Sequence, residues 1–207
     1  MSDFPTTARV VIIGGGAVGT SALYHLAKAG WTDCVLLEKN ELTAGSTWHA
    51  AGNVPTFSTS WSVMNMQRYS TELYRGLADE VDYPMNYHVT GSLRLSHSKE
   101  RTQEFERACG MGRYQGIDMS MLTLDEAVEM YPFLSTHDLH SVLHDPTDGD
   151  IDPAQLTQAL AKGARMRGAV IAERHGVRAI QRQGRRVTGV DWVSDDGANS
   201  GHIACEM

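Results

Sequence analysis

Long apolar runs, a cysteine pattern and an excess of positive charge are all missing from this sequence of 207 residues. No apolar run approaches the roughly 18 residues that cross a bilayer, so we expect no membrane span. Only three cysteines occur, Cys34, Cys109 and Cys205, and their spacing fits neither a metal site nor a disulfide framework. The formal net charge is −7, and such an acidic balance argues against a nucleic-acid partner, which usually meets a basic face.

A targeting signal is also missing, because residues 1–8 are too short and too polar to form one. The few cysteines suit a reducing compartment. These features predict a soluble protein, most simply a cytoplasmic one. The chain has 42% hydrophobic and 21% charged residues, which is ordinary for a globular protein and excludes disordered and fibrous classes.

The first forty residues have the pattern of a strand–helix–strand unit. The apolar runs Arg9–Ile13 and Cys34–Glu38 predict two buried parallel strands. Between them lie a glycine-rich turn, Gly14–Gly19, and a helical stretch, Thr20–Ala29, which Gly30 ends. We expect a right-handed crossover of the kind found in doubly wound α/β folds.

The rest of the chain predicts further helices and short strands. Two helix starts are marked by caps: a capping box at Thr123–Glu126, and Asp152 followed by Pro153. The other expected elements are the start of a helix near Ser46–Thr47, a helix over Ser60–Glu80 with an apolar stripe from Tyr69 to Val81, a hairpin or bent strand over Tyr87–Leu95, a helix over Lys99–Gly116, and strands over Ala169–Ala172, Gly176–Gln181, Arg186–Val193 and Gly201–Met207.

The glycine-rich turn carries the clearest chemical signal, because Gly14, Gly16 and Gly19 have the G-x-G-x-x-G spacing. The first glycine allows a tight turn, the second lets the backbone approach a pyrophosphate, and the third allows close packing of helix on strand. The N–H groups of Ala17 and Val18 open the helix, where they and the helix dipole favour phosphate oxygens.

An acidic residue ends the next strand. Glu38 follows Gly19 by 19 residues, close to the spacing of about 20 expected for the acid that binds a ribose. Its carboxylate would accept hydrogen bonds from ribose hydroxyls and repel a 2′-phosphate, and Lys39 is placed at the same strand end. The alternative is a glycine-rich turn without a ligand. The motif does not by itself separate FAD from NAD.

The segment Leu42–Gly52, Leu-Thr-Ala-Gly-Ser-Thr-Trp-His-Ala-Ala-Gly, resembles the flavin-binding segment of the dimethylglycine dehydrogenase and sarcosine dehydrogenase family. This family lies in the D-amino-acid-oxidase-like group of FAD-dependent amine oxidoreductases. Gly91–Leu95 and Asp148–Pro153 are similar to further stretches of it, so the likeness runs from Val10 to about Val193. The resemblance implies an α/β fold: a Rossmann-like FAD-binding domain with part of a mixed-sheet substrate domain.

The resemblance also implies which further residues contact FAD: Gly45, Ser46, Thr47, Trp48, His49, Ala50, Ala51, Gly52, Asn53 and Val177. His49 matches the histidine that can be joined covalently to the flavin 8α carbon, and the alternative is that it packs or hydrogen-bonds near the flavin. A backbone N–H and C=O at Val177 would hold the adenine edge, unless Val177 is an ordinary strand residue. Asn53 departs from the aliphatic residue expected there, which puts the substrate preference in doubt.

The implied domain has FAD-binding elements at about residues 8–56 and 150–207, and substrate-side elements at about 57–149. The family also has further chain after the position of Met207, which carries most substrate-binding residues, so no catalytic residue is nominated. We therefore expect a C-terminally truncated domain, inactive and poorly stable alone, with an unpaired sheet edge.

The implied activity is oxidation of an N-methyl group of a small amine such as dimethylglycine or sarcosine, with hydride transfer to flavin N5. The iminium product would be hydrolysed to formaldehyde, or captured by tetrahydrofolate in a further C-terminal domain. Oxygen or an electron-transfer flavoprotein would accept the electrons. The alternatives are another amine or amino-acid oxidase of the group, a non-catalytic regulatory flavoprotein, and an NAD-dependent dehydrogenase.

A metal site is not expected. The stretch His137–Asp145 is rich in histidine, but it lacks a helical ligand spacing and is better explained as solvated surface. The aspartates from Asp145 to Asp152 lack the spacing and closing glutamate of a calcium loop.

Overall fold

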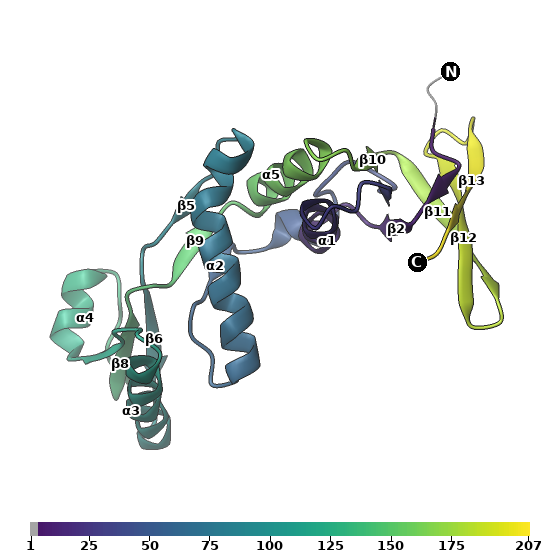
Figure 1. Ribbon diagram of the computed structural model, residues 1–207. Coiled ribbons are helices and arrows are strands. Elements are labelled where there is room, and N and C mark those ends of the chain that lie inside the picture. The colour runs from purple at the N-terminus through teal and green to yellow at the C-terminus, as the bar shows by residue number, and fades with distance from the viewer. Residues whose placement is uncertain (1–3) are drawn as a thin grey trace. The chain divides into compact units, whose positions relative to one another are not determined.

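The structure, a computed structural model, describes residues 4–207 and divides them into two compact units (Figure 1). Unit 1 contains the described residues up to Ala51 together with Gly76–Asn86 and Asp152–Met207. Unit 2 contains Gly52–Arg75 and Tyr87–Ile151. Helices and several sheets occur along the chain, so the mixed α/β fold class expected from the sequence is confirmed.

Unit 1 contains a parallel sheet whose strand order is β10 (Val170–Ala172), β3 (Cys34–Leu37) and β2 (Val10–Ile13). Every residue of β3 is buried, because a strand lies on each side of it. Helix α1 (Ala17–Lys28) connects β2 to β3, which confirms the expected strand–helix–strand unit. On the other side of β2, the N–H of Val11 donates to the carbonyl of Met207 at 2.8 Å.

A second sheet of unit 1 has the order β1 (Thr7–Ala8), β13 (Ser200–Cys205), β12 (Arg186–Ser194) and β11 (His175–Gln183). The last three strands are antiparallel, and β1 pairs parallel with β13. Buried side chains from both sheets form one core cluster: Val35, Leu37, Ala172, Val190, Trp192, Ile203 and Cys205. The late strands expected from the sequence are thus present, and their core packs on the parallel sheet.

Helix α5 (Pro153–Arg165) packs against α1 in unit 1. The approach is close, since a Cβ added at Gly163 would lie 2.8 Å from ring carbons of Tyr24. The expected cap of α5 is confirmed: the Asp152 carboxylate accepts from the N–H groups of Ala154 at 2.8 Å and Gln155 at 3.0 Å.

Unit 2 is built from two antiparallel sheets of three strands. One has the order β4 (Asn53–Val54), β9 (Gly149–Ile151) and β5 (Tyr87–His88), and the other the order β6 (Ser92–Ser96), β8 (Ser141–Asp145) and β7 (Ser120–Leu122). Its helices are α3 (Lys99–Tyr114) and α4 (Leu124–Met130), and α2 (Trp61–Val81) contributes residues to both units. The main core cluster of unit 2 includes Phe57, Met64, Phe105, Ile117, Met119 and Leu143.

Three local expectations were wrong or incomplete. Tyr87–Leu95 is neither a hairpin nor one bent strand: β5 and β6 belong to different sheets and pair with different strands, and Gly91 between them has a φ of 74°. The helix expected near Ser46–Thr47 is only a 3₁₀ turn, η1 (Ser46–His49). In α2, Leu77 and Val81 are buried as expected, but Tyr69 is 57% exposed, so the buried face does not follow the expected stripe through Tyr69.

Candidate functional site

The glycine-rich turn has a backbone that only glycine can form. Gly14 has a φ of 109°, a conformation that side-chain-bearing residues rarely adopt. A Cβ at Gly19 would lie 2.0 Å from the carbonyl oxygen of Gly14, and one at Gly16 would lie 2.8 Å from Thr47 Oγ1. Because these positions carry no side chain, a ligand can approach the backbone of the loop, and the loop can pack closely against the start of α1.

The N-terminus of α1 presents backbone donors beside this loop. Gly16 is the N-cap and has no side chain to satisfy the first N–H groups. The N–H of Ala17 donates to Thr47 Oγ1 at 3.0 Å, and Val18 is 86% exposed. The hydroxyl oxygen of Thr47 thus accepts from an N–H group of the kind that binds phosphate oxygens at helix N-termini. Thr47 and the glycine loop, which lie apart in the sequence, meet here.

Glu38 follows β3 and lies against the loop. Its Oε2 accepts from the N–H of Gly15 at 2.6 Å, and its Oε1 accepts from the N–H of Asn40 at 2.8 Å. These bonds fix the carboxylate at the carboxyl end of the parallel sheet, where ligands of open α/β sheets bind. A carboxylate there can accept hydrogen bonds from vicinal hydroxyl groups.

A cavity of about 400 Å³ opens at this edge of unit 1. The structure brings four of the predicted residues to its wall: Gly14, Glu38, Lys39 and Val177. Val177 lies on β11, at an irregularity in the pairing with β12 between Val177 and Ala179. Such a bulge leaves backbone groups outside the regular ladder.

Sequence reasoning did not anticipate the rest of the cavity wall, which includes Arg178, Ser194 and Asp195. These residues reach the site through the β11–β12 pairing, with His175 opposite Ser194. The N–H of His175 also donates to the carbonyl of Glu38 at 2.8 Å, which joins β11 to the end of β3. No short motif marks such a contact, because it depends on pairing between distant segments.

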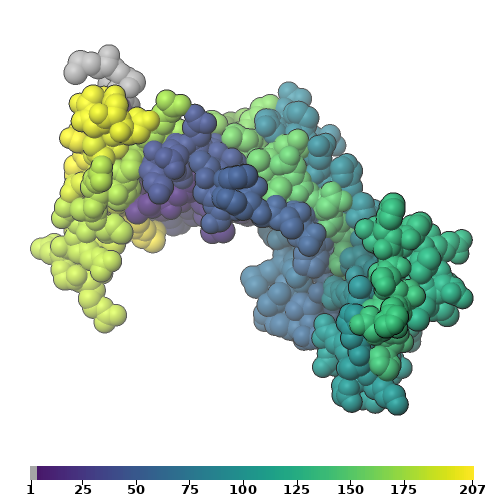
Figure 2. Space-filling view, turned by 180° about the vertical axis from the view of Figure 1, so that it is seen from behind, coloured from purple at the N-terminus to yellow at the C-terminus, as the bar shows by residue number. Residues whose placement is uncertain are grey.

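The segment Gly45–Ala51 belongs to unit 1 and lies at its surface, where Figure 2 shows it in dark blue. The rings of Trp48 and His49 lie 3.8 Å apart, and Trp48 is 61% exposed. Nδ1 of His49 lies 3.2 Å from the carbonyl of Gly45. Because a carbonyl only accepts, Nδ1 carries the proton in this bond.

Gly52 and Asn53 belong to unit 2. Asn53 opens β4 and lines a cavity of that unit. Within residues 4–207 no group of three or more His, Cys, Asp or Glu side chains is arranged to hold a metal ion. Among the same residues no helix is both long and apolar enough to cross a bilayer.

Comparison with known proteins supplies the family context. A sequence profile described as FAD dependent oxidoreductase matches residues 9–205. The chain is 42% identical over 169 residues to the mitochondrial dimethylglycine dehydrogenase of Rattus norvegicus, which covers 82% of this chain and 20% of that protein. These matches confirm the resemblance seen in the sequence.

Two further similarities extend over nearly all of the chain. It is 35% identical over 202 residues to the mitochondrial pyruvate dehydrogenase phosphatase regulatory subunit of Mus musculus, covering 98% of this chain and 22% of that protein. Among solved structures, L-proline dehydrogenase from P. horikoshii superposes with a TM-score of 0.87 at 26% identity, over 99% of this chain and 52% of that one. The chain thus spans about a fifth of the length of these curated relatives and about half of the solved structure.

Proposed function

The chain belongs to the family of FAD-dependent oxidoreductases, and on this premise we propose that it forms part of an enzyme oxidising N-methyl groups of a small amine. Dimethylglycine and sarcosine are the proposed substrates. The observation that carries the proposal is the 42% identity to a dimethylglycine dehydrogenase, in a chain whose glycine loop and Glu38 suit a dinucleotide. Bound FAD would supply the acceptor for a hydride from the N–CH₃ carbon.

The residues of unit 1 fit an FAD in three places. The amides of Gly16 and Val18 would hold the pyrophosphate at the start of α1, and the Ala17 amide would join them by exchanging its bond to Thr47 Oγ1. The Glu38 carboxylate would exchange its bond to the Gly15 amide, 2.6 Å long, for bonds to the ribose hydroxyls. Backbone groups at Val177 would hold the adenine edge across the cavity.

We further propose His49 as the residue that attaches the flavin covalently. Its exposed position, and the bond of Nδ1 to the Gly45 carbonyl, leave Nε2 as the nucleophilic nitrogen. The neighbouring residues of the same segment would then also contact the flavin. They are Gly45, Ser46, Thr47 and Trp48 before His49, and Ala50, Ala51, Gly52 and Asn53 after it.

The products and partners follow from the proposed reaction. An iminium ion would be hydrolysed to formaldehyde or passed to tetrahydrofolate, and oxygen or an electron-transfer flavoprotein would take the electrons. The catalytic residues that handle the amine are expected outside this chain. The relatives named above are mitochondrial proteins, and a cytoplasmic location stays a prediction.

A regulatory flavoprotein is the second candidate function. It is favoured by the 35% identity to the phosphatase regulatory subunit, which extends over 98% of the chain. In that case the protein would hold FAD at the same residues but would not turn over amines.

Anaerobic reduction of the flavin separates these functions. The protein from the complete reading frame is purified, and dimethylglycine or sarcosine is added while the absorbance of the oxidised flavin is followed. Bleaching by either amine, with formaldehyde or its tetrahydrofolate adduct formed in air, supports the enzyme. Bleaching only by amines without an N-methyl group would favour another oxidase of the group, and no bleaching by any amine would favour the regulator.

Acid precipitation tests the role of His49. We expect yellow colour in the protein pellet of the wild type, and colour only in the supernatant for His49→Ala. Colour released from the wild type would contradict covalent attachment and leave His49 as a neighbour of the flavin.

A further inference from the structure

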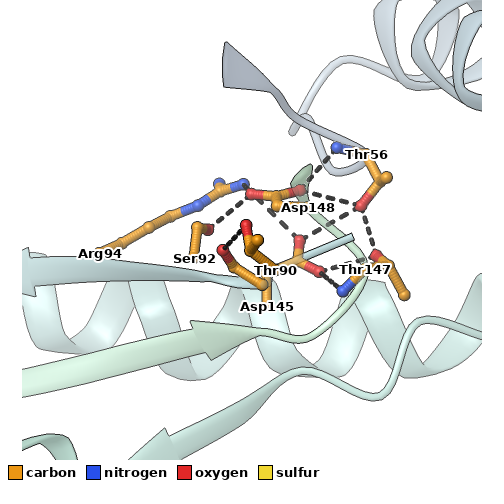
Figure 3. A network of polar contacts seen from close by, with 8 residues as sticks. Thr56, Thr90, Ser92, Arg94, Asp145, Thr147 and Asp148 are labelled. Carbon is orange, nitrogen blue, oxygen red and sulfur yellow. Dashed lines mark hydrogen bonds and ion pairs between the residues drawn. The ribbon is translucent and has the colours of Figure 1, made fainter. Parts of the chain in front are cut away.

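Carboxylate side chains hold loop backbones in both units. In unit 2, Asp148 accepts from the N–H of Thr56 at 2.7 Å and from the hydroxyl of Ser92 at 2.6 Å (Figure 3). Arg94 completes that network, so the donors around it satisfy the carboxylate and the network serves its own loop. In unit 1, the carboxylate of Glu173 holds a segment that lies against the glycine loop.

Glu173 is a half-buried residue in the turn between β10 and β11. Its Oε2 accepts from the N–H of Leu42 at 2.9 Å, and its Oε1 pairs with Arg165 at 3.2 Å. The side chain of Leu42 is buried. It packs on the glycine loop, because a Cβ added at Gly15 would lie 2.6 Å from Leu42 Cδ2. Glu173 therefore fixes the start of the segment Leu42–Thr47 against the glycine loop.

The next residue, Thr43, has a backbone conformation that threonine rarely adopts. Its φ is 74°, in the left-handed region, where a β-branched side chain crowds its own backbone. Such a conformation persists only where the surrounding contacts impose it. Here one contact is the bond that Glu173 makes to Leu42, and the other is the N–H of Thr43, which donates to the carbonyl of Gly15 at 3.1 Å.

The bond from Thr43 sets the orientation of the peptide between Gly15 and Gly16. This peptide is trans, and in a planar trans peptide the C=O and the following N–H point in opposite directions. Because the Gly15 carbonyl points at Thr43, the N–H of Gly16 points away from it. With glycine on both sides, the peptide could rotate at little steric cost. Rotation would present a carbonyl oxygen to the proposed pyrophosphate in place of an N–H group.

The far end of the same segment reaches the start of α1. Thr47 Oγ1 accepts from the N–H of Ala17 at 3.0 Å, and a Cβ added at Gly16 would lie 2.8 Å from the same oxygen. A shift of the segment Leu42–Thr47 would therefore disturb the surroundings of the Gly16 and Ala17 amides together.

We propose that Glu173 is a positioning residue for FAD. By holding the Leu42 amide it keeps Thr43 in its left-handed conformation, and Thr43 in turn keeps the N–H of Gly16 directed at the pyrophosphate. The inference rests on the proposed function, in which the glycine loop holds FAD. Glu173 acts through the segment and does not itself contact the cofactor. Its role requires an acceptor within reach of Leu42, and a negative charge is not essential to it.

Three substitutions of Glu173 in the complete protein separate reach from charge. Each is made together with His49→Ala, which keeps flavin binding reversible. Glu173→Ala removes the acceptor and is expected to raise the Kd for FAD about tenfold, the size of effect that one lost hydrogen bond produces. Glu173→Asp keeps the charge on a side chain one methylene shorter, and nearly the same loss is expected. Glu173→Gln keeps an acceptor at the same length and should stay within about twofold of the parent protein.

Thr43→Gly provides the sharper comparison, because glycine adopts a positive φ without crowding. Added to Glu173→Ala, it is expected to restore the Kd for FAD to within about threefold of the parent protein. Arg165→Gln is the matched control: it removes the ion pair to Glu173 but leaves the bond to Leu42, and exposed ion pairs contribute little. Titration of the apoprotein with FAD, followed by flavin fluorescence, measures all of these affinities.

Hydrogen exchange of the flavin-free protein tests the same link without the cofactor. We expect the amides of Leu42 and Thr43 to exchange about tenfold faster in Glu173→Ala and Glu173→Asp than in the parent protein and Glu173→Gln. If Glu173→Ala does not fold, Glu173→Asp takes its place in both measurements and in the combination with Thr43→Gly.

An unchanged Kd in Glu173→Ala, an equal loss in Glu173→Gln, or no recovery when Thr43→Gly is added would each overturn the positioning role and leave the proposed function intact. Unchanged exchange of the Leu42 and Thr43 amides in Glu173→Ala would overturn it as well. A folded parent protein that binds no FAD would contradict the proposed function itself, so titration of the parent distinguishes the two failures.

Discussion

The backbone of the glycine loop approaches α1 so closely at Gly19 that a methyl group does not fit there. Gly19→Ala would place a Cβ 2.0 Å from the Gly14 carbonyl oxygen, so the loop or α1 must move away from the pyrophosphate position. We expect the complete protein to bind FAD about tenfold more weakly, or worse. Titration of the apoprotein with FAD, followed by flavin fluorescence, measures this change. Gly76→Ala, where an added Cβ meets nothing within 4 Å, should leave the affinity unchanged.

At this scale the spacing of residues nominated cavity residues that lie within one local unit, whereas Val177 on β11 was nominated only through the family resemblance. Gly14, Glu38 and Lys39 could be nominated because their spacing along one strand–helix–strand unit is informative. The bond between Thr47 and the Ala17 amide could not, since it joins two loops. Arg178, Ser194 and Asp195 were missed because strand pairing brings them to the cavity.

At the scale of elements, the N-cap of α5 depends on a single side chain. Asp152→Ala removes the acceptor of the Ala154 and Gln155 amides. We expect the free energy of unfolding to fall by about 1 kcal/mol, measured by chemical denaturation of the complete protein. Asp79→Ala on the surface of α2 should change it by less than about 0.5 kcal/mol. An equal effect of both variants would contradict the capping role.

Elements were predictable where their signals are local. The capping box of α4 was expected from Thr123–Glu126, and the structure has both of its bonds. The stretch Tyr87–Leu95 was misjudged because alternation does not reveal the partner of a strand. β5 pairs with β9 and β6 with β8, both far along the chain, so neither could be assigned from neighbouring residues.

At the scale of the whole molecule, Glu80 links the end of α2 to α1 and to Arg167, which follows α5. Its carboxylate accepts from the Tyr24 hydroxyl at 2.6 Å and from Arg167 at 2.6 Å, and pairs with Lys28 at 3.2 Å. The hydrogen bond from Tyr24 is the main cause that lowers the pKa of Glu80 from its usual 4.5, with Lys28 and Arg167 adding to it. A lowered folded-state pKa means that Glu80 stabilises the fold above its ordinary pKa.

We therefore expect Glu80→Gln to lower the free energy of unfolding by about 1–2 kcal/mol at neutral pH. The difference from wild type should shrink as the pH falls from 4.5 through the lower folded-state pKa, because the wild-type carboxylate is then protonated. Denaturation curves across that range measure it. A difference that is constant with pH would show that the charge of Glu80 does not contribute.

We propose above that the glycine loop, Glu38 and the cavity beside them hold FAD. The most direct measurement is the visible spectrum of the complete protein, purified with FAD supplied, together with its affinity for NAD. We expect oxidised flavin bands in the wild type and weaker bands per protein in Gly19→Ala. A well-folded, colourless protein that binds NAD would contradict it and favour a nicotinamide-dependent dehydrogenase.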